Sequence, residues 1–163
     1  MADPFRLRVL KALTLVIQGV TPANGYEHDL ATSVFRGRIK FGEGDPIPMI
    51  SILEAPIPLE NQRSPNDSGL SSSKWELLIQ GFIRDDSENP SDPSHGLMGE
   101  VKAAIVKNKK QDRGNNILGM ENRVVSLNVG QGAVRPADEA SDVGFFWLTL
   151  TLQIVENLED PYW

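Results

Sequence analysis

A strict alternation of apolar and other side chains from Phe145 to Val155 constrains this chain more than any other pattern in it. Every second residue from Phe146 to Ile154 is large and apolar, whereas the residues between them are mainly Trp, Thr and Gln. Because side chains alternate between the two faces of a strand, the pattern predicts a long strand that buries one face. The sheet that contains this strand must therefore be covered on at least one side.

Four further segments have the composition of strands. They lie at residues 33–41, 49–54, 74–84 and 123–129. The turn-forming run from Gly42 to Pro46 separates the first two, which predicts a hairpin or near-hairpin. Residues 130–143 are expected to form a polar connection, in which Gly130-Gln131-Gly132 is a turn.

Two segments, 4–19 and 93–109, carry apolar residues at the helical period of 3.6. Each begins at an Asp-Pro pair, in which Asp3 or Asp92 is predicted to be the N-cap and proline suits the first helical position. The resulting order is helix, three strands, helix, two strands. It predicts an α+β fold: a mixed, mainly antiparallel sheet of about four to five strands with two helices packed on one face.

The length of 163 residues predicts a single domain spanning 1–163. Within it, segment 55–73 contains several prolines and a run of three serines and shows no periodicity. We therefore expect a long mobile loop at 55–73.

Charge and composition exclude several classes of function. The 16 Lys and Arg against 22 Asp and Glu give a net charge of -6, which argues against wrapping nucleic acid. Cysteine is absent, so disulfides, thiolate nucleophiles and cysteine-based zinc sites are excluded. The apolar stretch from Val9 to Val20 is too short to span a bilayer, and we expect no membrane partner.

Catalytic motifs are missing from the sequence. It contains no phosphate-binding glycine loop, no nucleophile elbow and no zinc-binding His-Glu-x-x-His motif. We therefore predict no catalytic residues, no cofactor and no metal site. The alternative is a small hydrolase-type enzyme that uses Glu27, His28 and Asp29 beside Tyr26. Because adjacent loop residues rarely converge on one ion, His28 is interpreted as a solvated loop histidine.

Three basic residues, Arg36, Arg38 and Lys40, have the spacing that places them on one face of the expected strand 33–41. This face is either a solvated outer face or a contact for an acidic partner, for which a neighbouring copy of the chain is the natural candidate.

Apolar residues also occur on strand faces that point away from the predicted core. Leu78 and Phe82 lie on the second face of strand 74–84, and Trp147 lies on the second face of strand 145–155. Either the long loop or the C-terminal tail folds over these residues, or they form an interface with another molecule.

Three groups of segments, taken in this order and spacing, resemble the tail terminator (tail completion) proteins of long-tailed bacteriophages. They are Val34–Arg38 leading to Asp45–Glu54, Trp75–Phe82 followed by Asn89-Pro90 and the second helix, and Val134–Glu139 running into the strand at Phe145, with Pro161-Tyr162 at the end.

The resemblance implies a structural virion protein without catalytic residues. Such proteins form a hexameric ring that caps the tail tube, stops its polymerisation and joins the tail to the head-side connector protein. The expected partners are other copies of the chain, the tube protein, the connector and genomic DNA that passes without specific binding. The expected location is the head–tail junction of the virion, after assembly in the bacterial cytoplasm. A head-side connector or neck protein of the same virion is the alternative.

A ring through which DNA passes benefits from an acidic lining, because carboxylates repel phosphate and DNA then slides through. We therefore expect some of the acids in two acidic segments to face the channel. They are Asp85, Asp86, Glu88, Asp138, Glu139 and Asp142. The basic residues of strand 33–41 are expected to pair with acids of an adjacent copy or of the tube protein.

Overall fold

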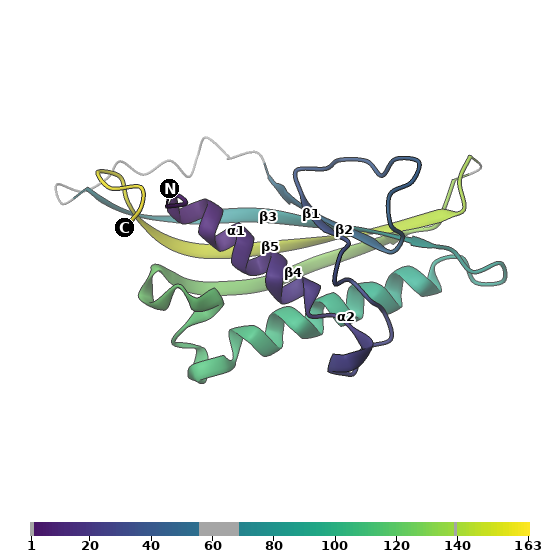
Figure 1. The fold of residues 1–163 in the computed structure, drawn as a ribbon, viewed down its shortest axis with the longest axis horizontal. Coiled ribbons are helices and arrows are strands. Elements are labelled where there is room, and N and C mark those ends of the chain that lie inside the picture. The colour runs from purple at the N-terminus through teal and green to yellow at the C-terminus, as the bar shows by residue number, and fades with distance from the viewer. Residues whose placement is uncertain (1, 56–68, 139) are drawn as a thin grey trace.

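The computed structural model describes residues 2–55, 69–138 and 140–163. It has two helices and five strands, with short 3-10 turns in the connections after each helix. In chain order they are α1 (Phe5–Gln18), β1 (Val34–Arg36), β2 (Met49–Glu54), β3 (Leu70–Arg84), α2 (Asp92–Lys109), β4 (Val124–Arg135) and β5 (Val143–Asn157). The strands form one sheet in the order β1-β2-β3-β5-β4, in which only β1 and β2 are parallel (Figure 1). The expected α+β fold is confirmed.

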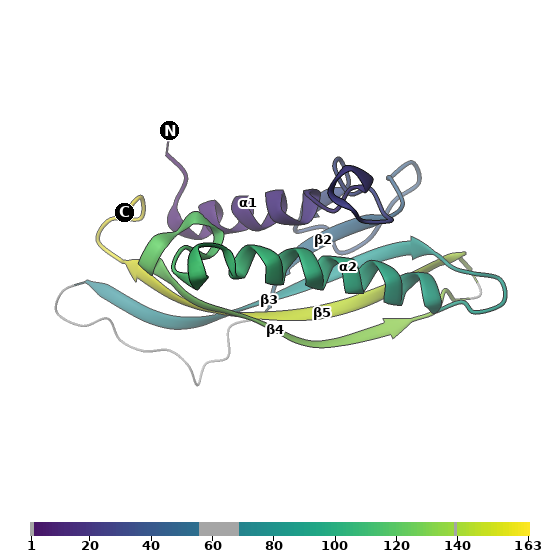
Figure 2. The same ribbon diagram turned by 90° about the horizontal axis from the view of Figure 1, so that it is seen from below.

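Both helices lie on the same face of the sheet, as Figure 2 shows from below. The alternating residues of β5 from Phe146 to Ile154 point into this layer and are fully buried. They pack in one cluster with residues of α1 such as Leu13 and of α2 such as Val101, which are also fully buried. The alternation in β5 and the helical period in α1 and α2 therefore predicted the main core correctly.

The predicted start of each helix is wrong in its capping residue. Asp3 makes no capping hydrogen bond, and its carboxylate instead lies 2.6 Å from Lys11 Nζ, two turns further along α1. The residue before α2 is Ser91, and Asp92 already belongs to the first turn. A carboxylate in that turn still interacts favourably with the helix dipole.

The predicted hairpin of strands 33–41 and 49–54 is also wrong. The first strand ends at Arg36, because Gly37 adopts a φ of 76° that leaves the extended conformation. The Gly37 N–H still donates to Ile52 O at 2.9 Å. The chain then loops round and enters β2 in the same direction as β1, which makes the pair parallel.

The loop between β1 and β2 contributes to a second, smaller hydrophobic cluster. In this cluster the Phe41 ring meets the Phe82 ring edge-on, with centroids 5.1 Å apart. Met49 and Val143 complete the buried part. Because Phe82 alternates with the core residues of β3, this cluster lies on the sheet face opposite the helices. Phe41, predicted as strand, and Ile47, which follows the predicted turn, therefore bring this loop over part of that face.

Three strands are longer than predicted, and β5 exceeds its predicted range of 145–155 by two residues at each end. β3 begins at Leu70, so residues 70–73 of the loop expected at 55–73 belong to the strand. Residues 56–68 of that expected loop lie outside the described residues. β4 runs on through Gly130 and Gly132 to Arg135, so the predicted turn and polar connection are wrong there. The long partner β5 continues the pairing past an irregularity between Val129 and Gly132, which explains the extension.

Candidate functional site

The sheet face opposite the helices holds the apolar residues that were predicted to form an interface. The β3–β5 register pairs Gln80 with Trp147 and Phe82 with Phe145, so Phe82 and Trp147 share this face with Leu78. Trp147 is 37% exposed and Leu78 is partly exposed, which leaves both on the surface. Phe82 is only 5% exposed inside the second cluster, so its prediction as an interface residue is wrong for this chain.

The three basic residues do not share one face, because β1 ends before the second of them. Arg36 donates to Thr14 Oγ1 of α1 at 2.9 Å. Arg38 lies 2.8 Å from Asp45 Oδ1, with its guanidinium 3.8 Å from the centre of the Phe35 ring. Lys40 is exposed on the loop. Two of the three thus have partners within their own chain, and the predicted single basic face is wrong.

The predicted channel acids that the structure describes lie on two connections at one end of the molecule, far from both termini (Figure 1). The Asp85 N–H of the β3–α2 connection donates to Asp142 O of the β4–β5 connection at 2.8 Å, which holds the two side by side. The structure therefore brings together a set of acids from distant parts of the sequence. They are Asp85, Asp86, Glu88, Asp138 and Asp142. Glu139 lies outside the described residues.

Asp86, Asp138 and Asp142 have defined local contacts, and Asp138 Oδ1 accepts the Ala140 N–H at 3.0 Å. Asp86 Oδ1 accepts hydrogen bonds from the N–H groups of Asn89 and Glu88 at 2.8 and 2.9 Å, and these bonds lower the pKa of the Asp86 carboxyl. Asp142 lies 2.5 Å from Arg84 Nη1, but both side chains are about two-thirds exposed, at 65% and 66%. These carboxylates are therefore in contact with solvent.

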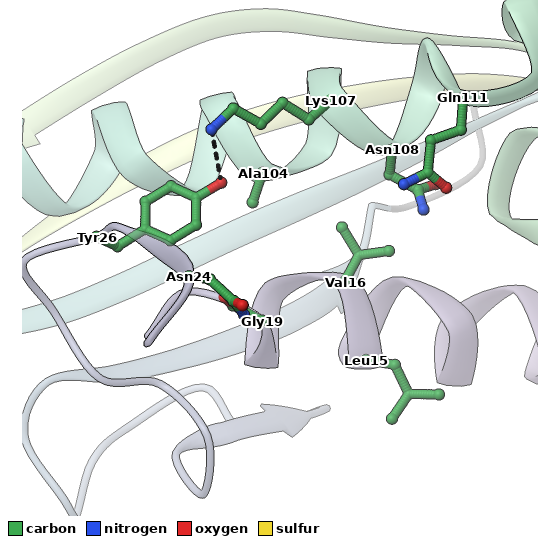
Figure 3. Close-up of a pocket in the computed structure, with 9 residues that line it drawn as sticks. All are labelled: Leu15, Val16, Gly19, Asn24, Tyr26, Ala104, Lys107, Asn108 and Gln111. Carbon is green, nitrogen blue, oxygen red and sulfur yellow. Dashed lines mark hydrogen bonds between the residues drawn. The ribbon is translucent and has the colours of Figure 1, made fainter. Parts of the chain in front are cut away.

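A groove of about 450 Å³ opens between the C-terminal halves of α1 and α2 (Figure 3). Val16 of α1 and Ala104 of α2 supply apolar walls, and Lys107 and Asn108 supply polar ones. The Lys107 ammonium lies 4.9 Å from the centre of the Tyr26 ring and 3.5 Å from its hydroxyl. Sequence reasoning missed this groove. The available signal was Asn108, a polar residue at helical spacing from the buried Ala104 and Val101.

Asn108 has an unusual environment within this groove. Its Oδ1 is buried and accepts no hydrogen bond from any described group. An unsatisfied buried carbonyl costs about 1–3 kcal/mol, so a donor brought in by another molecule would bind favourably here. The exposed side chain of Leu15, which is 70% accessible, borders the same groove.

His28 is not a solvated loop residue, which corrects the interpretation from sequence. Its Nδ1 lies 2.7 Å from Glu100 Oε2, and the two side chains are only 19% and 17% exposed. The Glu100 carboxylate also accepts the N–H groups of Glu27 and His28 at 2.6 and 3.2 Å. Burial works against ionisation of Glu100, but these hydrogen bonds outweigh it and lower the pKa of the carboxyl.

The side chains of the alternative enzyme hypothesis contact different partners and do not converge on one site. Tyr26 lies against Lys107, whereas Asp29 Oδ1 accepts the Ala31 N–H at 3.0 Å within its own turn. His28 and Glu100 together tether the loop after α1 to α2.

No group of three or more His, Asp or Glu side chains suited to a metal ion occurs among residues 2–55, 69–138 and 140–163. In the same described segments, neither helix is long and apolar enough to cross a membrane.

No model of a known protein family matches the sequence, and no curated protein matches it.

Proposed function

We propose that this chain is a structural virion protein that forms a homohexameric ring on the tail tube of a long-tailed bacteriophage. In this role it stops polymerisation of the tube and joins the tail to the head-side connector protein. The protein would be assembled in the bacterial cytoplasm and remain at the head–tail junction of the virion. The resemblance of three groups of segments to tail terminator proteins supplies the identity of the partners.

The observation that carries the proposal is the gathering of acids at one end of the molecule. Asp85, Asp86 and Glu88 lie beside Asp138 and Asp142 on two adjoining connections. With this end turned inward, six copies would line a passage with carboxylates. Such a surface repels phosphate, so DNA would pass without binding.

The open face of the sheet supports an assembly rather than a monomer. Leu78 and Trp147 are accessible there, outside the part covered by the loop between β1 and β2. Exposed aromatic and aliphatic side chains on one face are typical of subunit contacts. The role proposed for this face is contact with a neighbouring copy or with the tube protein.

The test is loss of the protein in the virus that encodes it. A stop codon within β3 should give tails longer than those of the parent virus in electron micrographs, and the chain supplied from a plasmid should restore normal length. Tails of normal length that are detached from heads would instead identify a head-side connector or neck protein. Intact virions of normal appearance would overturn a structural role of either kind.

A further inference from the structure

The groove between α1 and α2 has chemistry that defines the segment it can bind. Val16 and Ala104 offer an apolar surface, and Lys107 offers a cation. A matching segment presents an apolar side chain next to a carboxylate.

The chain itself carries such a segment on its surface. Leu158 is 54% exposed and is followed directly by the exposed acids Glu159 and Asp160. The acidic connections at the other end of the molecule present no exposed large apolar residue among the described positions. By contrast, the exposed Ile39 stands between Arg38 and Lys40, so its neighbours carry the charge of the groove lysine rather than the opposite one.

The Leu158–Asp160 turn is fixed in shape. Leu158 N–H donates to Gly69 O at 2.9 Å, and Asn157 Oδ1 accepts the N–H groups of Glu159 and Asp160 at 3.0 and 3.3 Å. A rigid projecting turn loses little conformational entropy when it binds.

The turn cannot reach the groove of its own chain. The tail is anchored to the start of α1, where the Phe5 N–H donates to Pro161 O at 2.9 Å. Leu15, at the groove, lies ten residues further along the helix, which corresponds to about 15 Å. A Leu158–Asp160 turn that binds in such a groove must therefore belong to another copy of the chain.

We propose that the Leu158–Asp160 turn of one copy inserts into the α1–α2 groove of a second copy. Leu158 packs on Val16 and Ala104, and the acids lie beside Lys107. Because the two surfaces are different, the contact is head-to-tail and propagates to a closed ring when the rotation between copies permits. The inference deepens the proposed ring and rests on it, since it names the contact between neighbours.

Cysteine crosslinking tests the contact directly, because the natural chain contains no cysteine. The double variant Leu15→Cys with Leu158→Cys should form a ladder of covalent oligomers up to the hexamer under mild oxidation, on the virion or with assembled tubes. Each single variant should give dimers at most. Val125→Cys with Leu158→Cys is the matched control, since Val125 is also exposed, at 56%, but lies on β4. A ladder no stronger than that of this control overturns the proposed contact.

Charge exchange gives a second measurement that does not depend on a disulfide. Lys107→Glu and Glu159→Lys should each reduce crosslinking of the Leu15→Cys/Leu158→Cys chain about tenfold or more, because like charges then face each other. The two substitutions combined should restore most of the yield. Failure of the combined variant to recover, with the fold intact by circular dichroism, overturns the charge pairing.

These results are separable from a failure of the proposed function. Normal tail capping without the crosslink ladder would remove this contact and leave the function standing. A ladder in a protein that never alters tail length would confirm the contact and remove the function.

Discussion

Phe146 of β5 packs its ring directly over Gly81, its partner on β3. A Cβ atom added at Gly81 would lie only 2.1 Å from Phe146 Cε1 and 2.5 Å from Cζ. Phe146 is fully buried beneath the helices, so its ring has no free space into which it could move. The glycine therefore admits the largest fully buried side chain of the core into the centre of the sheet.

Gly81→Ala should lower the free energy of unfolding by about 2–3 kcal/mol, because the added methyl group overpacks the core. Urea unfolding followed by circular dichroism measures this loss. The double variant Gly81→Ala with Phe146→Leu should recover part of it, since the smaller side chain makes room.

Gly99→Ala is the matched control on α2. An added Cβ there meets nothing within 4 Å, and alanine favours a helix by about 1 kcal/mol over glycine. This variant should unfold at a higher urea concentration. Equal destabilisation of the two variants would contradict the packing described for Gly81.

Phe82 and Trp147 share a sheet face but should respond differently to truncation. Phe82→Ala should cost about 3–5 kcal/mol of stability, because it empties the second cluster around Met49 and Phe41. Trp147→Thr should cost clearly less, because the indole is 37% exposed. Its main effect should be weaker association of copies, measured by sedimentation velocity. Unfolding curves with the same midpoint for both variants would contradict this difference.

The regular parts of the fold could be predicted from local patterns. The alternation around Leu150 and the helical period around Leu13 specify which side chains are buried, and burial specifies how the layers face each other. The parallel β1–β2 pair could not be predicted in this way, because it depends on the positive φ of Gly37 and on where the following loop finds apolar surface.

The candidate sites depended even more on tertiary contacts. The acidic end joins two connections that are far apart in the sequence. Their charge could be read from the sequence, but not that they lie side by side. The groove depends on how α1 and α2 pack against each other. In the sequence, only the polar Asn108 on an otherwise apolar helix stripe indicated a groove there. The His28–Glu100 pair joins a loop to a distant helix, and the sequence contains no motif that links them.

Glu100→Gln should lower stability at about pH 7 by roughly 1.5–3 kcal/mol, because a charged hydrogen-bond acceptor for His28 and Glu27 is lost. The pKa of Glu100 is lower in the folded chain than its ordinary value of 4.5. Its contribution is therefore fully present above the unfolded pKa and disappears as the pH falls through the folded pKa.

Urea unfolding of the parent chain and Glu100→Gln at successive pH values tests this dependence. The difference between the two should be constant near neutrality and shrink in acid. Glu76→Gln, which changes an exposed carboxylate on β3, should show no comparable difference at any pH. A penalty for Glu100→Gln that persists unchanged in strong acid would contradict the assigned hydrogen bonds.

If the chain lines a DNA passage as proposed, neutralising the acidic end should affect DNA transport without affecting the fold. Glu88→Gln combined with Asp138→Asn removes two exposed charges. Asp138 Oδ1 accepts the Ala140 N–H at 3.0 Å, and the amide oxygen that replaces it can accept the same hydrogen bond. We expect stability to change by no more than about 0.5 kcal/mol, as is usual for exposed positions. Virions carrying the variant should release DNA more slowly after triggering, with the largest effect at low salt, because a less charged lining repels phosphate less. Release at the parental rate across salt concentrations would show that these acids do not face the passage.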